Sequence, residues 1–322
     1  MSGEHSVVYG CPALALALDR HATATVSVVD HPGVVIRLGD RTPVSWTLDE
    51  ISTQASELDA RHRRFLDNQC AIESVLQSPE ALFAYCAAQV FQARGLPAHG
   101  LRLDLHTDIP PGCGMGSSAA LILASLRALA LHRGEALPDE RALGLCAEHL
   151  QHGRSSGLDI HASALGGMIR FADGVGEALP APAGPLLLAH TGIPEVSTGV
   201  CVQAVREAFA GDQALWQAFA DCTNAFTQLV SEGRMDALRE TIMENHQLLV
   251  HIGVVPERVQ AFIREVEAGG GAGKICGAGS IKGDAAGAVF VYGAGETAEA
   301  LMAKWNYKRL EMGLATHGTQ AS

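Results

Sequence analysis

The stretch Pro110-Pro111-Gly112-Cys113-Gly114-Met115-Gly116-Ser117-Ser118-Ala119-Ala120 decides the fold. Residues 101–106 before it alternate between apolar and polar, which predicts a strand, and residues 117–132 have the apolar spacing of a helix. Glycines let the backbone approach an anion closely, and the free N–H groups of the following helix point toward that anion. We therefore expect a phosphate-binding loop with these contacts: Gly112, Gly114, Gly116, and the hydroxyls of Ser117 and Ser118.

This loop has two simpler interpretations. It is not a Walker A loop, because no lysine follows its last glycine, Gly116. A bare glycine-rich turn that ends in a serine helix cap is the structural alternative, but the length of the P-x-x-x-G-x-G-S-S-A-A pattern favours phosphate binding.

Composition excludes several classes of protein. The chain has 322 residues, of which 48% are hydrophobic, so it can bury a sizeable core in one large or two ordinary domains. Its formal net charge of -12 argues against nucleic acid and anionic membrane surfaces as partners. None of its eight cysteines has C-x-x-C spacing, which is typical of reduced thiols in a cytosolic protein. With Glu4 and His5 where a signal peptide would be basic, we expect a cytoplasmic enzyme.

Strands and helices are predicted in clusters. The opening residues 7–48 are predicted to form a β-meander because β-branched and small apolar runs are separated by Gly, Pro and Asp. Further strands are predicted at 168–171, 186–190 and 288–292, and helices at 51–60, 81–93, 140–152, 197–209, 212–232, 235–249, 257–268 and 297–305. This order predicts an α+β fold rather than regular β-α-β alternation. The Pro- and Ala-rich residues 180–185 suggest a linker, and hence an N-terminal domain at 1–180 and a C-terminal domain at 181–322.

The stretch 148–159, EHLQHGRSSGLD, places a carboxylate at a helix end and another in the following loop. Transfer of a γ-phosphoryl group needs a metal ion that holds the polyphosphate and a group that orients the acceptor hydroxyl, so two carboxylates fit this chemistry. A surface glutamate and an Asx-turn aspartate are the structural alternative. The stretch also contains the G-x-S-x-G pattern of a hydrolase nucleophile elbow, centred on Ser155. An elbow needs a strand before it, whereas a helix is predicted here, so a serine hydrolase is a remote alternative.

These segments resemble the GHMP kinases, which include galactokinase, homoserine kinase, mevalonate kinase and phosphomevalonate kinase. Residues 148–159 are similar to the mevalonate kinase pattern E-x-x-x-H-G-x-x-S-G-x-D, and residues 3–10 to its opening G-E-H-A-V-V-x-G. The resemblance implies a two-domain α+β fold with an N-terminal domain like ribosomal protein S5 domain 2 and a ferredoxin-like C-terminal domain. It implies an ATP- and Mg²⁺-dependent kinase that phosphorylates the 5-hydroxyl of mevalonate in isoprenoid synthesis.

The same resemblance implies roles for single residues. Ser118 and Glu148 would hold Mg²⁺, and Asp159 would orient or deprotonate the acceptor hydroxyl. Glu4 and His5 would face the substrate, as would the hydroxyl of Thr198, because 193–198 is similar to the family's V-P-x-S-T turn with one residue inserted. Residues 274–280 resemble the third family motif, K-x-T-G-A-G-G-G-G, which would place Gly277 and Gly279 near the phosphates. An ordinary glycine-rich turn is the alternative for this segment.

The chain departs from the family pattern at both ends. Members carry P-G-K just before G-E-H, and here the sequence starts at Met1. Either the true start lies upstream of this Met, or another cation, with Lys282 and Arg154 as candidates, substitutes for the lysine. We expect the first, a shortened N-terminus. Cys276 replaces the usual Thr of the third motif, and Lys282 and Asp284 stand among its trailing glycines. Gln151 is a further candidate for the substrate side.

These departures leave alternatives open. Another GHMP kinase, acting on phosphomevalonate, a sugar or homoserine, is the nearest, and a non-catalytic nucleotide-binding member is the next. The oligomeric state is also open, with a homodimer among the candidates.

Overall fold

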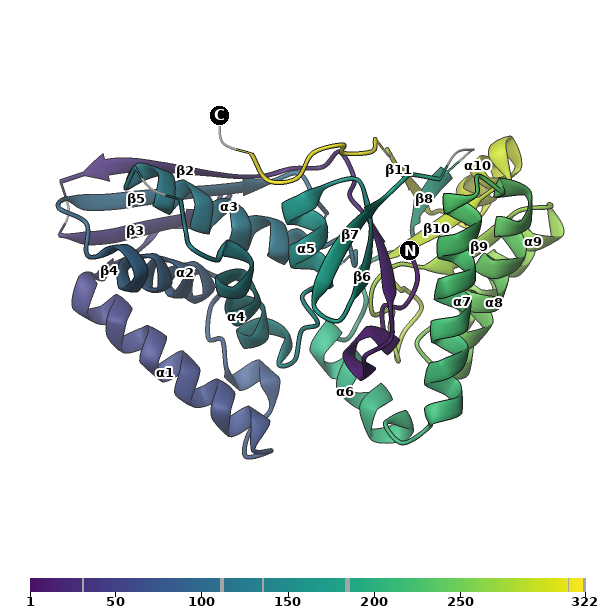
Figure 1. The fold of residues 1–322 in the computed structure, drawn as a ribbon, viewed down its shortest axis with the longest axis horizontal. Coiled ribbons are helices and arrows are strands. Elements are labelled where there is room, and N and C mark those ends of the chain that lie inside the picture. The colour runs from purple at the N-terminus through teal and green to yellow at the C-terminus, as the bar shows by residue number, and fades with distance from the viewer. Residues whose placement is uncertain (31, 111–112, 135, 183–185, 312, 321–322) are drawn as a thin grey trace. The chain divides into compact units, whose positions relative to one another are not determined.

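The computed structural model of the protein describes residues 1–30, 32–110, 113–134, 136–182, 186–311 and 313–320. They form two compact units, each assembled from separate stretches of the chain (Figure 1). Unit 1 comprises Met1–Asp19, Pro110–Met115 and Leu165–Gly318, and unit 2 comprises Arg20–Ile109, Gly116–Ala164 and Thr319–Ser322. Across the described ranges, no helix is long and apolar enough to cross a membrane.

Unit 2 is built on a four-stranded sheet in the order β2-β5-β3-β4. Its strands are β2 (Ala22–Val29), β3 (Gly33–Leu38), β4 (Val44–Thr47) and β5 (Gly100–Thr107). The prediction of a β-meander is wrong here. The later strand β5 lies between β2 and β3, antiparallel to the first and parallel to the second. Leu101, Leu103 and Leu105 of β5 are all buried. A central position in the sheet therefore lets this strand bury more apolar surface than a position at the edge would.

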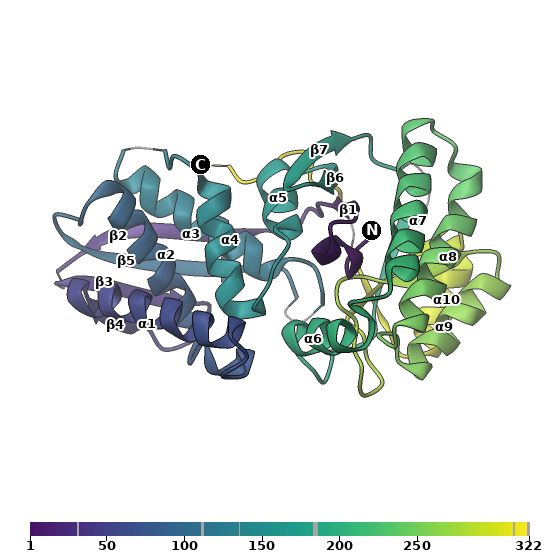
Figure 2. The ribbon, with the colours of Figure 1, turned by 60° about the horizontal axis from the view of Figure 1, so that its bottom comes forward.

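Helices cover one side of this sheet, as Figures 1 and 2 both show. They are α1 (Leu48–Leu66), α2 (Pro79–Arg94), α3 (Ser117–His132), α4 (Glu140–His152) and α5 (Leu158–Leu165), with a 3₁₀ turn η2 (Ile72–Ser74). Side chains that accept a backbone N–H bond fix the first turns of α1, α2 and α4, namely Thr47, Ser78 and Asp139. The apolar core of unit 2 lies between these helices and the sheet.

Unit 1 contains two sheets, in the orders β1-β6-β7 and β11-β8-β10-β9. Their strands are β1 (Ala13–Leu16), β6 (Met168–Ala172), β7 (Val175–Leu179), β8 (Leu186–His190), β9 (Ala272–Ile275), β10 (Ala288–Tyr292) and β11 (Lys308–Leu310). The first predicted strand is therefore split. Residues Ser6–Tyr9 form a 3₁₀ turn, η1, and β1 belongs to a different sheet from β2.

The helices of unit 1 pack on the four-stranded sheet. They are α6 (Thr198–Phe209), α7 (Gln213–Ser231), α8 (Leu238–His251), α9 (Glu257–Ala268) and α10 (Gly295–Lys304), with a 3₁₀ turn η3 (Met235–Ala237). Every residue of β10 is buried, because the sheet has an apolar cluster on each face. Val289 and Val291 join one cluster, and Phe290 and Tyr292 join the other.

The compact units do not follow the expected boundary at residue 180. Leu14 of β1 and Met168 of β6 share an apolar cluster with Leu188 and Phe290, so the N-terminal segment packs with C-terminal residues inside unit 1. The division into residues 1–180 and 181–322 stays a prediction about family domains. Part of the expected linker, residues 183–185, lies outside the described residues.

Candidate active site

The end of the predicted phosphate loop leads directly into α3. The N-cap residue of the helix is Gly116, which lies in the left-handed region with φ of 68° and has no side chain that could cap the first turn. Ser117 and Ser118 are the first two residues of α3, so backbone N–H groups at this end are available to an anion. Gly112 lies outside the described residues.

Two carboxylates of unit 2 lie close to this helix start. Glu148, near the end of α4, is 2% exposed, and Asp159 lies in the first turn of α5. A Cβ atom added to Gly116 would lie 3.6 Å from Cγ of Asp159, so that carboxylate lies beside the end of the loop. Burial raises the pKa of Glu148, and the charge of Asp159 raises it further.

Ser118 belongs to the same group of side chains. Its hydroxyl donates a hydrogen bond of 2.5 Å to Oε1 of Gln151, which follows Glu148 by about one helical turn. A hydroxyl and carboxylates are hard oxygen donors of the kind that Mg²⁺ prefers. Within the described ranges, no group of three or more His, Cys, Asp or Glu could hold a metal ion alone. The chemistry of these donors suits Mg²⁺, which proteins commonly bind through one or two carboxylates together with phosphate oxygens and water.

Ser155 does not have the surroundings of a hydrolase nucleophile. Its hydroxyl donates to Oε2 of Glu148 at 2.6 Å, whereas Nε2 of His149 donates to the Ser155 carbonyl oxygen at 3.1 Å. The nucleophile elbow of a serine hydrolase follows a strand, whereas here the helix α4 precedes Ser155, and His149 contacts its carbonyl oxygen rather than its hydroxyl. The geometry does not support the serine hydrolase alternative.

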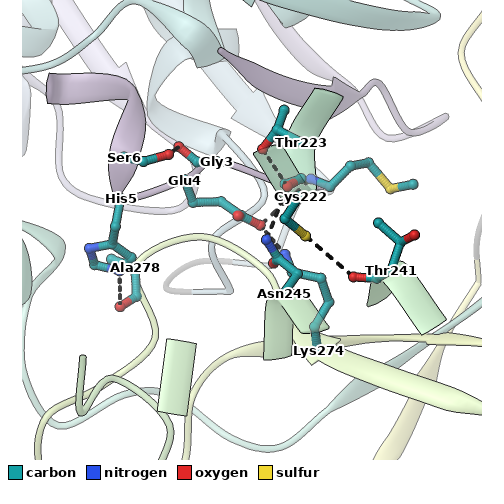
Figure 3. A network of polar contacts seen from close by, with 12 residues as sticks. Gly3, Glu4, His5, Ser6, Cys222, Thr223, Thr241, Asn245, Lys274 and Ala278 are labelled. Carbon is teal, nitrogen blue, oxygen red and sulfur yellow. Dashed lines mark hydrogen bonds and ion pairs between the residues drawn. The ribbon is translucent and has the colours of Figure 1, made fainter. Parts of the chain in front are cut away.

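In unit 1, the opening G-E-H segment contacts the third motif (Figure 3). The ammonium group of Lys274, which is fully buried, forms an ion pair and hydrogen bond with Oε1 of Glu4. Burial alone would raise the pKa of Glu4, but the charge and hydrogen bond of Lys274, together with the ammonium group of Met1 at 3.6 Å, outweigh that effect, and the pKa falls to about 2. Nε2 of His5 donates to the carbonyl oxygen of Ala278 at 3.0 Å.

Lys274 stands in the third sequence motif, but no role was predicted for it. A lysine that is buried in a strand needs an acidic partner, but no strand is predicted at Ala272–Ile275, so the local pattern does not indicate this burial. The partner, Glu4, lies 270 residues earlier in the chain, and no local pattern identifies it.

A buried polar cluster surrounds this ion pair. Ser2 and Thr223 share a hydroxyl hydrogen bond of 2.7 Å, and Nδ2 of Asn245 donates to Ser2 at 3.0 Å. The thiol of Cys222 donates to the carbonyl oxygen of Thr241. These bonds satisfy polar groups that burial would otherwise leave unpaired, so they hold α7, α8 and the N-terminal segment in register.

Glycines allow the third motif to lie against the phosphate loop inside unit 1. A Cβ atom on Gly277 would be 2.7 Å from Cα of Gly114, and one on Gly279 would be 2.2 Å from the carbonyl oxygen of Val254. Both glycines also have φ near +65°, a backbone conformation that residues with a side chain adopt only at an energetic cost. The backbone of Cys276, where the family has Thr, donates to Ala288, which in turn donates to the carbonyl of Cys113.

The remaining candidates are more exposed. Thr198 is exposed at the start of α6, and the thiol of Cys201, one turn later, donates to the same Ala278 carbonyl that His5 contacts. The proposed stand-in cations Lys282 and Arg154 are exposed, as is Asp284. The structure thus brings together Gly116, Ser118, Glu148 and Asp159 in unit 2, and in unit 1 it joins Gly114 to Gly277 and His5 to Ala278.

Known proteins resemble the chain along most of its length. A family model described as "GHMP kinases N terminal domain" matches residues 82–167. A mevalonate kinase from Thermococcus sibiricus is 30% identical over 296 residues, which cover 86% of this chain and 83% of that protein.

Solved structures share the fold at lower identity. Mevalonate kinase from Methanococcus jannaschii superposes with a TM-score of 0.76 at 16% identity, covering 97% of this chain and 94% of that one. Galactokinase from Lactococcus lactis gives a TM-score of 0.74 at 15% identity, covering 98% and 91%. These similarities confirm the predicted two-domain α+β GHMP kinase fold. With the Thermococcus relative, they show that the chain belongs to the mevalonate kinase family of the GHMP kinases, which makes it an ATP-dependent phosphotransferase with an alcohol group as acceptor.

Proposed function

We propose that the protein transfers the γ-phosphoryl group of ATP to the 5-hydroxyl of mevalonate. The observation that carries this proposal is the grouping of Gly116, Ser118, Glu148 and Asp159 in a chain whose relatives are named mevalonate kinases. In the reaction, the bond between the γ-phosphorus and the ADP oxygen breaks, a bond to the acceptor oxygen forms, and the hydroxyl proton leaves.

Asp159 is the proposed catalytic residue. Its carboxylate lies beside Gly116, at the end of the phosphate loop, where an acceptor hydroxyl must approach the γ-phosphorus. There it orients the hydroxyl and accepts its proton as the new bond forms.

The proposed phosphate site uses backbone and hydroxyl donors. Its members are Gly112, Gly114, Gly116, Ser117 and Ser118, together with Gly277 and Gly279 of the third motif. Support comes from the glycine N-cap of α3, which has no side chain to occupy the first N–H groups, and from the close approach of Gly277 to Gly114. Ser118 and Glu148 would hold Mg²⁺, which when bound neutralises charge on the polyphosphate.

Glu4, His5 and Thr198 are the proposed substrate-side residues. Each is linked to the third motif of unit 1. Glu4 pairs with Lys274, His5 contacts Ala278, and the helix that starts at Thr198 contacts Ala278 through Cys201. The predictions of a cytoplasmic location and of a homodimer stay predictions.

The test is ADP release from ATP and Mg²⁺ with mevalonate, phosphomevalonate, homoserine and galactose supplied separately. We expect turnover with mevalonate and a loss of kcat of about 10²- to 10⁴-fold in Asp159→Asn. Asp139→Asn is the matched control, because Asp139 caps α4 through Ala142 and asparagine caps a helix equally well. Preference for another acceptor would overturn the mevalonate assignment. ATP binding without turnover of any acceptor would favour a nucleotide-binding member without catalysis.

A further inference from the structure

The turn between α4 and α5 carries a serine that the transfer proposed above does not use. Oγ of Ser155 donates to Oε2 of Glu148 at 2.6 Å and accepts the backbone N–H of Gly157 at 3.2 Å. The Glu148 side chain is buried, so few water molecules compete for this carboxylate. A hydrogen bond from a hydroxyl to a buried carboxylate is short and strong, and it restricts the rotamers at both ends.

Two imidazoles hold the backbone of the same turn. Nε2 of His62, on α1, donates to the carbonyl oxygen of Gly153 at 2.7 Å, and Nε2 of His149 donates to that of Ser155 at 3.1 Å. The two rings stack with their centroids 5.8 Å apart. Ser155 is therefore fixed through its main chain as well as its hydroxyl, so its Oγ has a defined position relative to Glu148.

The same hydroxyl connects the two carboxylates of the site. Gly157, whose N–H it accepts, immediately precedes α5, and Asp159 is the second residue of that helix. A single oxygen atom, Oγ of Ser155, thus joins the side chain of Glu148 to the backbone that leads to Asp159.

We propose that Ser155 is a positioning residue whose hydroxyl holds Oε2 of Glu148 and directs Oε1 toward the metal ion that accompanies the nucleotide. This inference depends on the metal-binding role of Glu148 in the proposed function. It does not depend on which alcohol is the acceptor, so the two can fail separately.

The experiment measures Mn²⁺ binding in the presence of ADP and without any acceptor, by electron paramagnetic resonance of the free ion. The wild type is compared with Ser155→Ala, Ser155→Thr and the control Ser125→Ala. Ser125 is buried in α3, and its hydroxyl donates to the carbonyl of Leu121 at 2.7 Å. Ser125→Ala therefore also removes a buried serine hydrogen bond from unit 2, but at a position far from Glu148 in the sequence. Circular dichroism checks the fold of each variant, and Ser155→Cys, which keeps the size but donates weakly, replaces the alanine variant if that one does not fold.

We expect Ser155→Ala to weaken Mn²⁺ binding by about tenfold or more, and kcat to fall in parallel. Ser155→Thr and Ser125→Ala should remain within about threefold of the wild type, since threonine retains the hydroxyl. Unchanged Mn²⁺ affinity in Ser155→Ala, or an equal loss in Ser125→Ala, would overturn the inference. Ser155-dependent Mn²⁺ binding in a protein that does not turn over mevalonate would support the positioning role and reject the acceptor assignment.

Discussion

At the scale of single residues, the buried ion pair between Glu4 and Lys274 offers a direct energetic test. The side chains are 9% and 0% exposed. Removing one partner leaves the charge of the other buried and uncompensated, whereas replacing both with uncharged side chains removes both charges of the pair. We predict that Glu4→Gln and Lys274→Met each lower the free energy of unfolding by about 3–5 kcal/mol, and that the double variant loses far less than their sum. Urea unfolding of the four proteins measures this. Additive losses would contradict the prediction.

The same pair predicts how stability depends on pH. The pKa of Glu4 is about 2 in the folded protein, against an ordinary value of 4.5. Because the folded pKa is the lower one, the ionised carboxylate stabilises the fold above about pH 4.5, and this contribution is lost as the pH falls toward 2. Its size is on the order of 3 kcal/mol.

We therefore predict that acid destabilises the wild type more than the double variant Glu4→Gln/Lys274→Met. The measurement is the urea midpoint of both proteins between pH 6 and pH 3. If the gap between the two midpoints stays constant over this range, Glu4 does not titrate as described.

The resemblance of two motifs to the GHMP kinases predicted Ser118, Glu148 and Asp159 as one group, and the structure places them together in unit 2. Their chemical roles stay predictions. The partners of Lys274 and Ser155 were not predictable from the sequence. The first depends on a contact across 270 residues, and the second on a rotamer that the surrounding turn selects.

At the scale of elements, the local signals for helices were sufficient. The predictions at 117–132, 140–152 and 257–268 are confirmed by α3, α4 and α9, because their apolar periodicity and terminal residues are strong. The order of strands in a sheet is not a local property, and this is why a meander was expected where β5 inserts between β2 and β3. The short elements β7, β11 and α5 were not predicted, since three to eight residues carry little periodicity.

The contact between the third motif and the phosphate loop predicts an asymmetric effect of two alanine substitutions. Gly277 has φ of +68° and lies against Gly114, whereas Gly233 has φ of +69° and a Cβ atom added there would meet nothing within 4 Å. Both substitutions force alanine into a left-handed conformation, at a cost of about 1 kcal/mol. Only Gly277→Ala also crowds a backbone neighbour.

We predict that Gly277→Ala lowers the free energy of unfolding by at least about 1 kcal/mol more than Gly233→Ala, and that it alone weakens ADP binding. Urea unfolding and calorimetric titration with ADP measure the two effects. Equal effects of the two substitutions would show that conformational strain, and not the close approach to Gly114, sets the cost of a side chain at position 277.

At the scale of the whole molecule, the fold does not select the acceptor. Similar TM-scores relate this chain to a mevalonate kinase and to a galactokinase, so one architecture supports phosphoryl transfer to different alcohols. The net charge of -12 likewise gives no general attraction for ATP, which must depend on local N–H donors and cations. Acceptor choice therefore depends on a few side chains, and assays of single variants test it better than comparison of folds.

Among the residues that the structure describes, the apolar clusters of the two compact units have no member in common, and this predicts how the molecule unfolds. Leu103 belongs to the core of unit 2, and Phe290 belongs to one of the two clusters of unit 1. Each is at most 2% exposed, and truncation of such a side chain to alanine costs about 2–5 kcal/mol. When cores are separate, a cavity in one should lower the free energy of local opening mainly in its own unit.

We predict that Leu103→Ala speeds amide hydrogen exchange in β2, β5 and α3 and leaves β10 and α9 near their wild-type rates, and that Phe290→Ala does the reverse. Exchange followed by mass spectrometry of peptides from each unit measures this. If either variant speeds exchange equally in both units, the chain opens as one cooperative body, and the separate clusters do not define independent folding units. The reciprocal pair of variants makes this distinction, because a general loss of stability cannot produce opposite patterns in the two units.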